Sequence, residues 1–131
     1  MAKIHRIDGR TRVRFPQRGE IYLTELDPAV GHEIKKTRPA LIIQNDVANR
    51  VTLLTIVAPI TSTIRLPLSP VHVLIEASLK TGLRVTSVAS FDQIRTVDRI
   101  RLISWLGSVN DETMERVDEA IQISLGVTRL D

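Results

Sequence analysis

The segment Thr37-Arg38-Pro39 joins a cationic side chain to a restrained backbone. Proline pushes the residue before it into an extended conformation, and residues 39–44 form an apolar run that predicts a buried strand. Arg38 is therefore expected at the end of a loop, where the buried strand begins. A guanidinium held at such a point can bind a phosphate through two parallel hydrogen bonds. The same spacing also fits a surface arginine that forms a salt bridge.

Three consecutive hydroxyl side chains, Thr61, Ser62 and Thr63, follow a second apolar stretch, residues 51–60. That stretch predicts another strand, so the hydroxyls are expected just past its end. Hydroxyls in this position can hydrogen-bond a phosphate. By themselves, however, Ser and Thr are also ordinary turn residues.

Metal and cofactor chemistry find little support in the sequence. The absence of cysteine excludes disulfides and thiolate metal sites. The three histidines, His5, His32 and His72, are far apart, and none lies in a HExxH motif or beside paired carboxylates. The chain has neither a Walker phosphate loop nor a GxGxxG motif. We therefore expect no metal and no cofactor.

Aromatic residues make up only 3% of the chain. A platform on which nucleobases stack needs several aromatic side chains on one sheet face. Tyr22, Phe91 and Trp105 are therefore expected to pack in the core or at an interface. Trp105 is the best single candidate for stacking on a base.

Charge is distributed unevenly, although the net charge is only +3. Residues 1–18 contain six Lys or Arg against one Asp, whereas residues 110–119 contain five Asp or Glu against one Arg. This asymmetry favours a polyanionic partner on one side of the molecule, and a mixed solvated surface is the alternative. Lys35 and Lys36, just before Arg38, are expected to attract phosphates.

A chain of 131 residues forms one domain. Residues 1–17 show no convincing periodicity and predict a flexible basic arm, so the folded domain is expected over residues 18–131. The longest apolar stretch is far shorter than the roughly 20 residues that a membrane-spanning helix needs. Because the N-terminus also lacks the apolar segment of a signal peptide, we expect a cytoplasmic protein without a membrane partner.

The remaining pattern is mainly β. Asn110 can cap one long helix, in which Met114, Val117, Ile121 and Leu125 recur at helical spacing as a buried stripe before Gly126. Residues 45–50 are expected to form a turn. The predicted strands cover residues 20–26, 39–44, 51–60 and 71–76, and more weakly residues 87–91, 94–97 and 101–109. This order predicts an α+β domain: a small SH3-like antiparallel barrel with a C-terminal helix.

Several segments occur in the order and spacing of one known family. They are residues 18–22, 26–28, 31–33, 38–46, 56–61, 92–98 and 117–126. Together they resemble the MazF/PemK toxins of type II toxin–antitoxin systems, over about residues 18–127. One departure is that Ile34, Lys35 and Lys36 stand where relatives often carry small residues, which can change the bases that are recognised.

The resemblance implies a function and a set of partners. It implies a homodimer with the PemK/CcdB-like toxin fold that cleaves single-stranded RNA at short sequences without the ribosome or a metal. It also implies inhibition by a cognate antitoxin, for which an acidic, disordered segment is the expected inhibitor. The family's catalytic arginine and threonine correspond to Arg38 and Thr61. RNA-binding roles are expected for Glu33, Lys35, Lys36, Ser62 and Gln93.

The expected chemistry agrees with these residue types. In metal-free RNA cleavage the ribose 2′-OH attacks the phosphate and leaves a 2′,3′-cyclic phosphate and a 5′-OH. Negative charge builds up on the phosphate oxygens, and Arg38 supplies a positive charge while Thr61 supplies a hydrogen bond. His32 is a candidate for the base because histidine titrates near neutral pH.

Two other functions share the predicted fold. CcdB-type toxins poison DNA gyrase through a tryptophan at the extreme C-terminus. Here the last residues are 127–131 and the single tryptophan is Trp105, which disfavours that alternative. The second alternative is an SH3-like binding module without catalysis.

Overall fold

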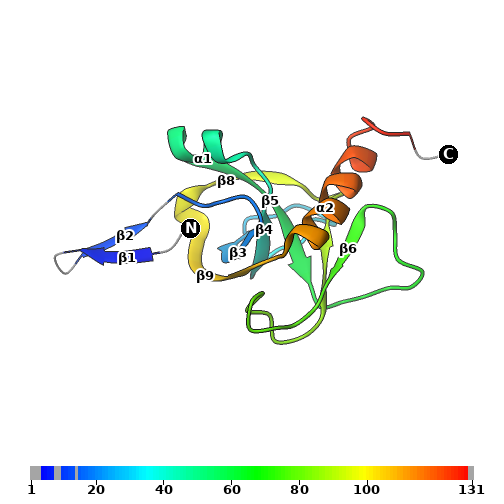
Figure 1. The fold of residues 1–131 in the computed structure, drawn as a ribbon, viewed down its shortest axis with the longest axis horizontal. Coiled ribbons are helices and arrows are strands. Elements are labelled where there is room, and N and C mark those ends of the chain that lie inside the picture. Colours follow the sequence, from blue (N-terminus) through cyan, green and yellow to red (C-terminus); the bar gives the residue numbers. More distant parts are fainter. Residues whose placement is uncertain (1–3, 8–9, 14, 130–131) are drawn as a thin grey trace.

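The computed structural model describes residues 4–7, 10–13 and 15–129 (Figure 1). The predicted mainly β fold with a long C-terminal helix is confirmed. The elements in chain order are β1 (Ile4–Ile7), β2 (Arg10–Val13), β3 (Glu20–Glu25), β4 (Thr37–Ile42), α1 (Asp46–Val51), β5 (Leu54–Thr61), β6 (His72–Ile75), β7 (Ser87–Ser90), β8 (Arg95–Asp98), the 3-10 helix η1 (Arg99–Arg101), β9 (Leu102–Ser108) and α2 (Asp111–Ser124).

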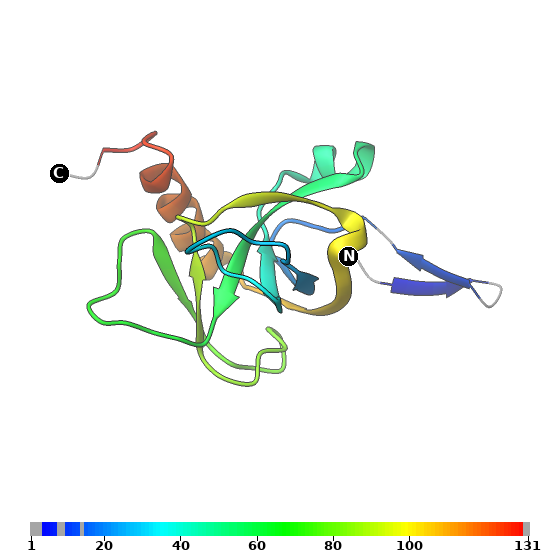
Figure 2. The ribbon, with the colours of Figure 1, turned by 180° about the vertical axis from the view of Figure 1, so that it is seen from behind.

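Within the described residues, seven strands form one antiparallel sheet in the order β6-β7-β5-β4-β3-β9, and β8 also pairs with β5. The loop after β6 then reaches β9, where the Ser108 amide donates to the Lys80 carbonyl at 2.8 Å. This contact joins the two ends of the strand order, so the sheet is barrel-like. The helix α2 packs across one side of it (Figures 1 and 2).

The core consists of two apolar clusters on the two faces of the central strands. The larger lies beneath α2 and includes Phe91, Val117 and Ala120, while the smaller includes Tyr22 and Val57. Alternating side chains of β3, β4 and β5 contribute to both clusters, because successive residues of a strand point to opposite faces. These three strands are therefore held from both sides.

The long helix begins as the sequence predicts. The Asn110 side chain accepts a hydrogen bond from the Thr113 amide at 2.8 Å, and Gly126 adopts a left-handed φ of 75° after the last turn. One position of the predicted apolar stripe is wrong, since Leu125 is 65% exposed. The helix ends at Ser124, so its buried face ends before Leu125 and includes Ala120 instead.

The turn predicted for residues 45–50 is also wrong, because this segment forms the short helix α1. Asn45 caps the helix by accepting from the Ala48 amide at 2.8 Å. Asn49 is fully buried, donating to the Gln44 carbonyl at 3.0 Å and accepting from the Thr55 hydroxyl at 2.8 Å. A buried polar network thus replaces the solvated turn, and β5 begins at Leu54 rather than at residue 51.

The N-terminal segment contains one pair of strands in the described residues. β1 and β2 pair with each other in antiparallel register, Ile4 opposite Val13, and form a sheet of their own. They project from the main sheet in both views (Figures 1 and 2). The expected flexible arm falls partly on residues 1–3, 8, 9 and 14, which lie outside the described residues, and its flexibility stays a prediction.

The Asn49 network generates a stability prediction. Asn49→Ala should lower the free energy of unfolding by about 2–3 kcal/mol, because the buried Gln44 and Thr55 groups lose their partner. Urea unfolding measures the change. Arg50→Ala, at an exposed position of the same helix, is the control and should stay within about 0.5 kcal/mol of wild type. Equal midpoints for Asn49→Ala and the control would contradict the structural role of the network.

Candidate functional site

Arg38 lies near the start of β4 and Thr61 at the end of β5, each two residues beyond the last pair of the β4–β5 ladder. The ladder pairs Ile42 with Val57 and Ala40 with Pro59, and the same register continued by two residues places Arg38 opposite Thr61. Thr61 is the last residue of β5 and Arg38 the second of β4. The antiparallel pairing therefore brings together two residues that are far apart in the sequence.

The side chain of Arg38 is half-buried and is oriented by its own loop. Its Nε donates to the Lys35 carbonyl at 2.9 Å. Within residues 15–129, the two terminal guanidinium nitrogens of Arg38 have no hydrogen bond or ion pair. One edge of the guanidinium is thus held by the protein, and the other is free to contact a ligand. The salt bridge that the sequence left open as an alternative is not formed with any described residue.

Thr61 offers a hydroxyl donor. Its Oγ1 accepts a hydrogen bond from the Thr63 amide at 3.2 Å, which orients the side chain. A hydroxyl that accepts in this way still has its own proton to donate. Thr61 is half-buried and pairs with Val88 of β7, which restrains its backbone.

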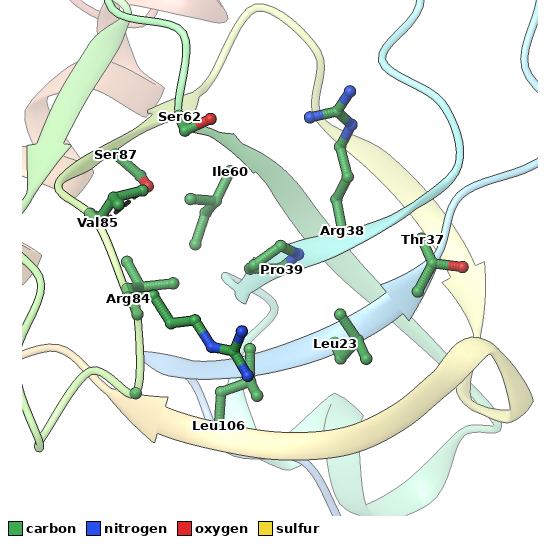
Figure 3. Close-up of a pocket in the computed structure, with 12 residues that line it drawn as sticks. Leu23, Thr37, Arg38, Pro39, Ile60, Ser62, Arg84, Val85, Ser87 and Leu106 are labelled. Carbon is green, nitrogen blue, oxygen red and sulfur yellow. Dashed lines mark hydrogen bonds between the residues drawn. The ribbon is translucent and has the colours of Figure 1, made fainter.

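A cavity of about 420 Å³ opens beside Arg38 (Figure 3). Apolar side chains, among them Leu23, Ile60 and Leu106, form much of its wall. Ser62 lies at its edge, as does Arg84, an arginine that the sequence analysis did not single out. Its lining residues are Leu23, Thr37, Arg38, Pro39, Ile60, Ser62, Gly82, Leu83, Arg84, Val85, Ser87 and Leu106. None of these carries an acidic side chain.

A second cavity of about 400 Å³ is lined by part of the loop before β4 and by the segment that leads into β8. Its lining includes two of the residues expected to bind RNA, Glu33 and Gln93, together with His32 and Asp92. The Gln93 side-chain oxygen accepts from the Ile34 amide at 2.6 Å. The Glu33 carboxylate accepts from the Val30 amide. Both side chains therefore shape the loop as well as line the cavity.

Three expected site residues line neither of these two cavities: Lys35, Lys36 and Thr61. Lys35 and Lys36 are exposed, and their side chains form no hydrogen bond or ion pair with residues 15–129. Lys36 has a left-handed φ of 72°, which is uncommon for a residue with a side chain. Its amide donates to Asp27 Oδ1 at 2.8 Å, so the unusual turn is supported from the start of the loop.

Two arginines that the sequence analysis did not assign support this loop. Arg95 donates to the Leu26 carbonyl at 2.8 Å, and Arg101 donates to the carbonyls of Glu25 and Asp27. Both come from strands or turns far away in the sequence, so no local pattern identifies them. They fix the point at which the loop leaves β3.

The aromatic residues pack, as expected. Tyr22 and Phe91 are buried, and the indole of Trp105 donates to Glu20 Oε2 at 3.0 Å while packing against the smaller cluster. Burial raises the pKa of the Tyr22 hydroxyl far above its ordinary value, and the nearby Glu20 carboxylate raises it further. Trp105 is thus tied into the sheet on the side of β3, and its stacking on a base stays a prediction.

Among residues 4–7, 10–13 and 15–129, no helix is long and apolar enough to cross a membrane. In the same part of the chain, no three His, Asp or Glu side chains gather where they could hold a metal ion.

Comparison with known proteins places the chain among toxins. Residues 17–125 match the model of the family described as PemK-like, MazF-like toxin of type II toxin–antitoxin system. Endoribonuclease EndoA of Bacillus subtilis is 44% identical over 111 residues, which cover 85% of this chain and 95% of that protein.

Solved structures agree with that match. The MazF structure from Deinococcus radiodurans has a TM-score of 0.73 at 29% identity, covering 86% of this chain and 98% of that one. An endoribonuclease in complex with its cognate antitoxin from a mycobacterial species has a TM-score of 0.72 at 27% identity, covering 88% of this chain and 99% of that one.

The contact between Gln93 and the loop generates a testable prediction. Gln93→Ala should speed amide hydrogen exchange at Ile34, because that amide loses its acceptor. The Leu26 amide, which donates to the Lys36 carbonyl, should keep its protection. Gln93→Glu retains an acceptor and serves as the control. Unchanged exchange at Ile34 in Gln93→Ala would show that the side chain does not hold the loop.

Proposed function

The chain belongs to the family of PemK-like, MazF-like toxins of type II toxin–antitoxin systems and is an endoribonuclease, and we propose that it cuts single-stranded RNA without a metal, with Arg38 and Thr61 as its catalytic residues. The observation that supports this proposal is the β4–β5 register: continued by two residues, it sets the held guanidinium of Arg38 against the hydroxyl donor of Thr61. RNA as substrate also favours action in the cytoplasm.

The proposed reaction is a transesterification. The ribose 2′-oxygen forms a bond to the adjacent phosphorus, and the bond from phosphorus to the 5′-oxygen breaks. The 2′-OH proton leaves to a base, the 5′-oxygen takes up a proton, and the products are a 2′,3′-cyclic phosphate and a 5′-OH end. His32, which lines the neighbouring cavity, is the candidate for one of these proton transfers.

Arg38 and Thr61 act on the charge that develops during this reaction. Negative charge gathers on the non-bridging phosphate oxygens in the transition state, where preorganised donors are most effective. The free guanidinium edge of Arg38 supplies two parallel donors, and the Thr61 hydroxyl supplies a third. Arginine stays protonated, so we assign it to charge stabilisation and not to proton removal.

Substrate binding extends from this point along the loop before β4. Lys35 and Lys36 are free cations that attract the phosphates on either side of the cut, and Ser62 adds a hydroxyl at the cavity edge. Glu33 and Gln93 line the adjoining cavity, where they can contact bases as well as hold the loop. We further propose a homodimer, since two barrels side by side form a longer groove than one.

The same basic surface suits an inhibitor. One solved relative is an endoribonuclease in complex with its cognate antitoxin. We propose that an acidic, disordered antitoxin segment binds along Lys35, Lys36 and Arg38 and replaces the RNA phosphates. Such segments order on binding and are drawn by the same electrostatic field as RNA.

The first functional prediction concerns Arg38. Arg38→Ala should reduce cleavage at least 10²–10³-fold, the usual effect of losing one preorganised donor. Arg38→Lys should not restore the rate, because the planar fork is lost. Cleavage of a long RNA in EDTA, with mapping of the 5′-OH ends, measures both variants and wild type.

Three outcomes of that assay would count against the proposal. Wild-type rates in both Arg38 variants would remove the residue from the mechanism. Loss of wild-type activity in EDTA, restored by a divalent ion, would contradict metal independence. A wild-type chain that cuts no RNA would favour the gyrase-poison or binding-module alternatives.

The second functional prediction concerns the shared surface. Lys35→Glu combined with Lys36→Glu should weaken RNA and antitoxin together, and both affinities should fall with added salt, that for RNA more steeply. A competition titration between RNA and the antitoxin tests this. Glu115→Lys, on the exposed face of α2, is a control that should leave both affinities unchanged. A ternary complex with undiminished RNA affinity would place the antitoxin elsewhere, for example on the acidic helix.

A further inference from the structure

The loop of residues 76–86, between β6 and β7, lies in direct backbone contact with β9. A Cβ atom at Gly82 would lie 2.0 Å from the Leu106 carbonyl oxygen, and one at Gly107 would lie 2.1 Å from the Lys80 carbonyl oxygen. Real side chains do not fit at such distances, so both glycines are required for the contact. Gly82 also has a left-handed φ of 71°. The loop is thus pressed against the sheet rather than projecting into solvent.

Internal hydrogen bonds make the same loop rigid. The Thr81 hydroxyl donates to the Glu76 carbonyl at 3.0 Å, and the Ser78 amide donates back to that hydroxyl at 3.1 Å. The Gly82 amide donates to the Ser78 carbonyl at 2.9 Å. Further along, the Ser87 hydroxyl donates to the Val85 carbonyl at 2.9 Å. The residues on either side of Arg84 are therefore positioned before any ligand arrives.

Arg84 is the charged side chain that this loop presents to the cavity beside Arg38, together with the apolar Leu83 and Val85. In the view of Figure 3 the two arginines stand on opposite sides of the cavity, with Pro39 and Ile60 between them. Arg84 is exposed and has no hydrogen bond or ion pair with residues 15–129. By contrast, Arg18, Arg95 and Arg101 are all bound to carbonyl or carboxylate groups of the protein.

The cavity therefore has a cation at each side and no acidic side chain in its wall. Two guanidinium groups on opposite sides of one cavity create a positive potential in it, which suits an anionic ligand that lies between or beside them. The volume, about 420 Å³, falls within the roughly 300–1,000 Å³ of typical ligand sites. The apolar wall leaves room for a base next to its phosphate.

We propose that Arg84 binds the RNA phosphate adjacent to the scissile one, as a positioning residue of the cleavage reaction. This inference rests on the proposed function of the Arg38 site and names a second cation in it. A contact made equally in the ground state and the transition state changes KM and leaves kcat alone. Arg84 thus sets affinity and register, while Arg38 acts on the reacting phosphate.

The test measures binding separately from cleavage. The probe is a short single-stranded RNA with methylated 2′-oxygens, which lacks the nucleophile, and the proteins are the full chain and its variants. Arg84→Ala should weaken binding about tenfold, and the slope of log Kd against log salt should become shallower by about 0.7, the value for one phosphate contact on a single strand. Arg84→Lys should keep the slope, because the charge is retained, while losing part of the affinity.

Arg50→Ala is the matched control. Arg50 is also an exposed arginine without a partner in residues 15–129, but it lies on α1, at the opposite end of the molecule from the 76–86 loop (Figures 1 and 2). It should leave both affinity and slope unchanged. With an unmodified RNA that the wild type cuts, Arg84→Ala should raise KM about tenfold with kcat unchanged.

Three results would overturn the proposal. The first is an Arg84→Ala variant with wild-type affinity and slope. The second is an equal loss in Arg84→Ala and Arg50→Ala, which would reflect net charge alone. The third is an unchanged slope together with a smaller mass in sedimentation, which would assign Arg84 to a contact between subunits. Failure of the wild type to cleave RNA would instead count against the proposed function. The binding comparison uses an RNA with methylated 2′-oxygens and does not require cleavage.

Discussion

The pairing of β4 with β5 is the constraint on which the candidate site depends. β4 is flanked by β3 and β5, and β5 in turn carries β7 and β8, so a shift of this one register would move most of the sheet. In a strand, a shift of one residue also exchanges the buried and exposed faces. Because both faces of these strands are packed, the register is strongly specified, and with it the approach of the start of β4, which carries Arg38, to the end of β5, which carries Thr61.

Two sets of arginines have different roles in this structure. Arg18, Arg95 and Arg101 donate to the protein's own carbonyl or carboxylate oxygens and connect segments that are far apart in the sequence. Arg38 and Arg84 keep free guanidinium edges around one cavity. This division explains how a chain with a modest net charge can attract a polyanion, since the charges used in structure are already neutralised or hydrogen-bonded locally.

The loops around the cavity are ordered by hydrogen bonds to distant elements. The loop before β4 is held by Arg95, Arg101 and Gln93, and the loop after β6 is held by its contact with β9. Donors that are fixed before the substrate binds lose little freedom when it does, which is the condition for effective electrostatic catalysis. The barrel therefore serves as a rigid frame for loops that carry the candidate chemistry.

The sequence by itself determined the seven strands of the main sheet as segments along the chain, the capped C-terminal helix and the identity of the family, because apolar periodicity, Asn110 and the motif spacing are local properties. It also pointed to Arg38, through the proline that follows. It did not predict α1, since the helix depends on a buried network between Gln44, Asn49 and Thr55 that forms only when β5 packs against it. Likewise, Arg84, Arg95 and Arg101 look alike in the sequence, and only the tertiary structure decided which of them meet a protein carbonyl and which faces the cavity. Hydrogen-bond partners across the sheet depend on register and loop packing, and no local pattern encodes those.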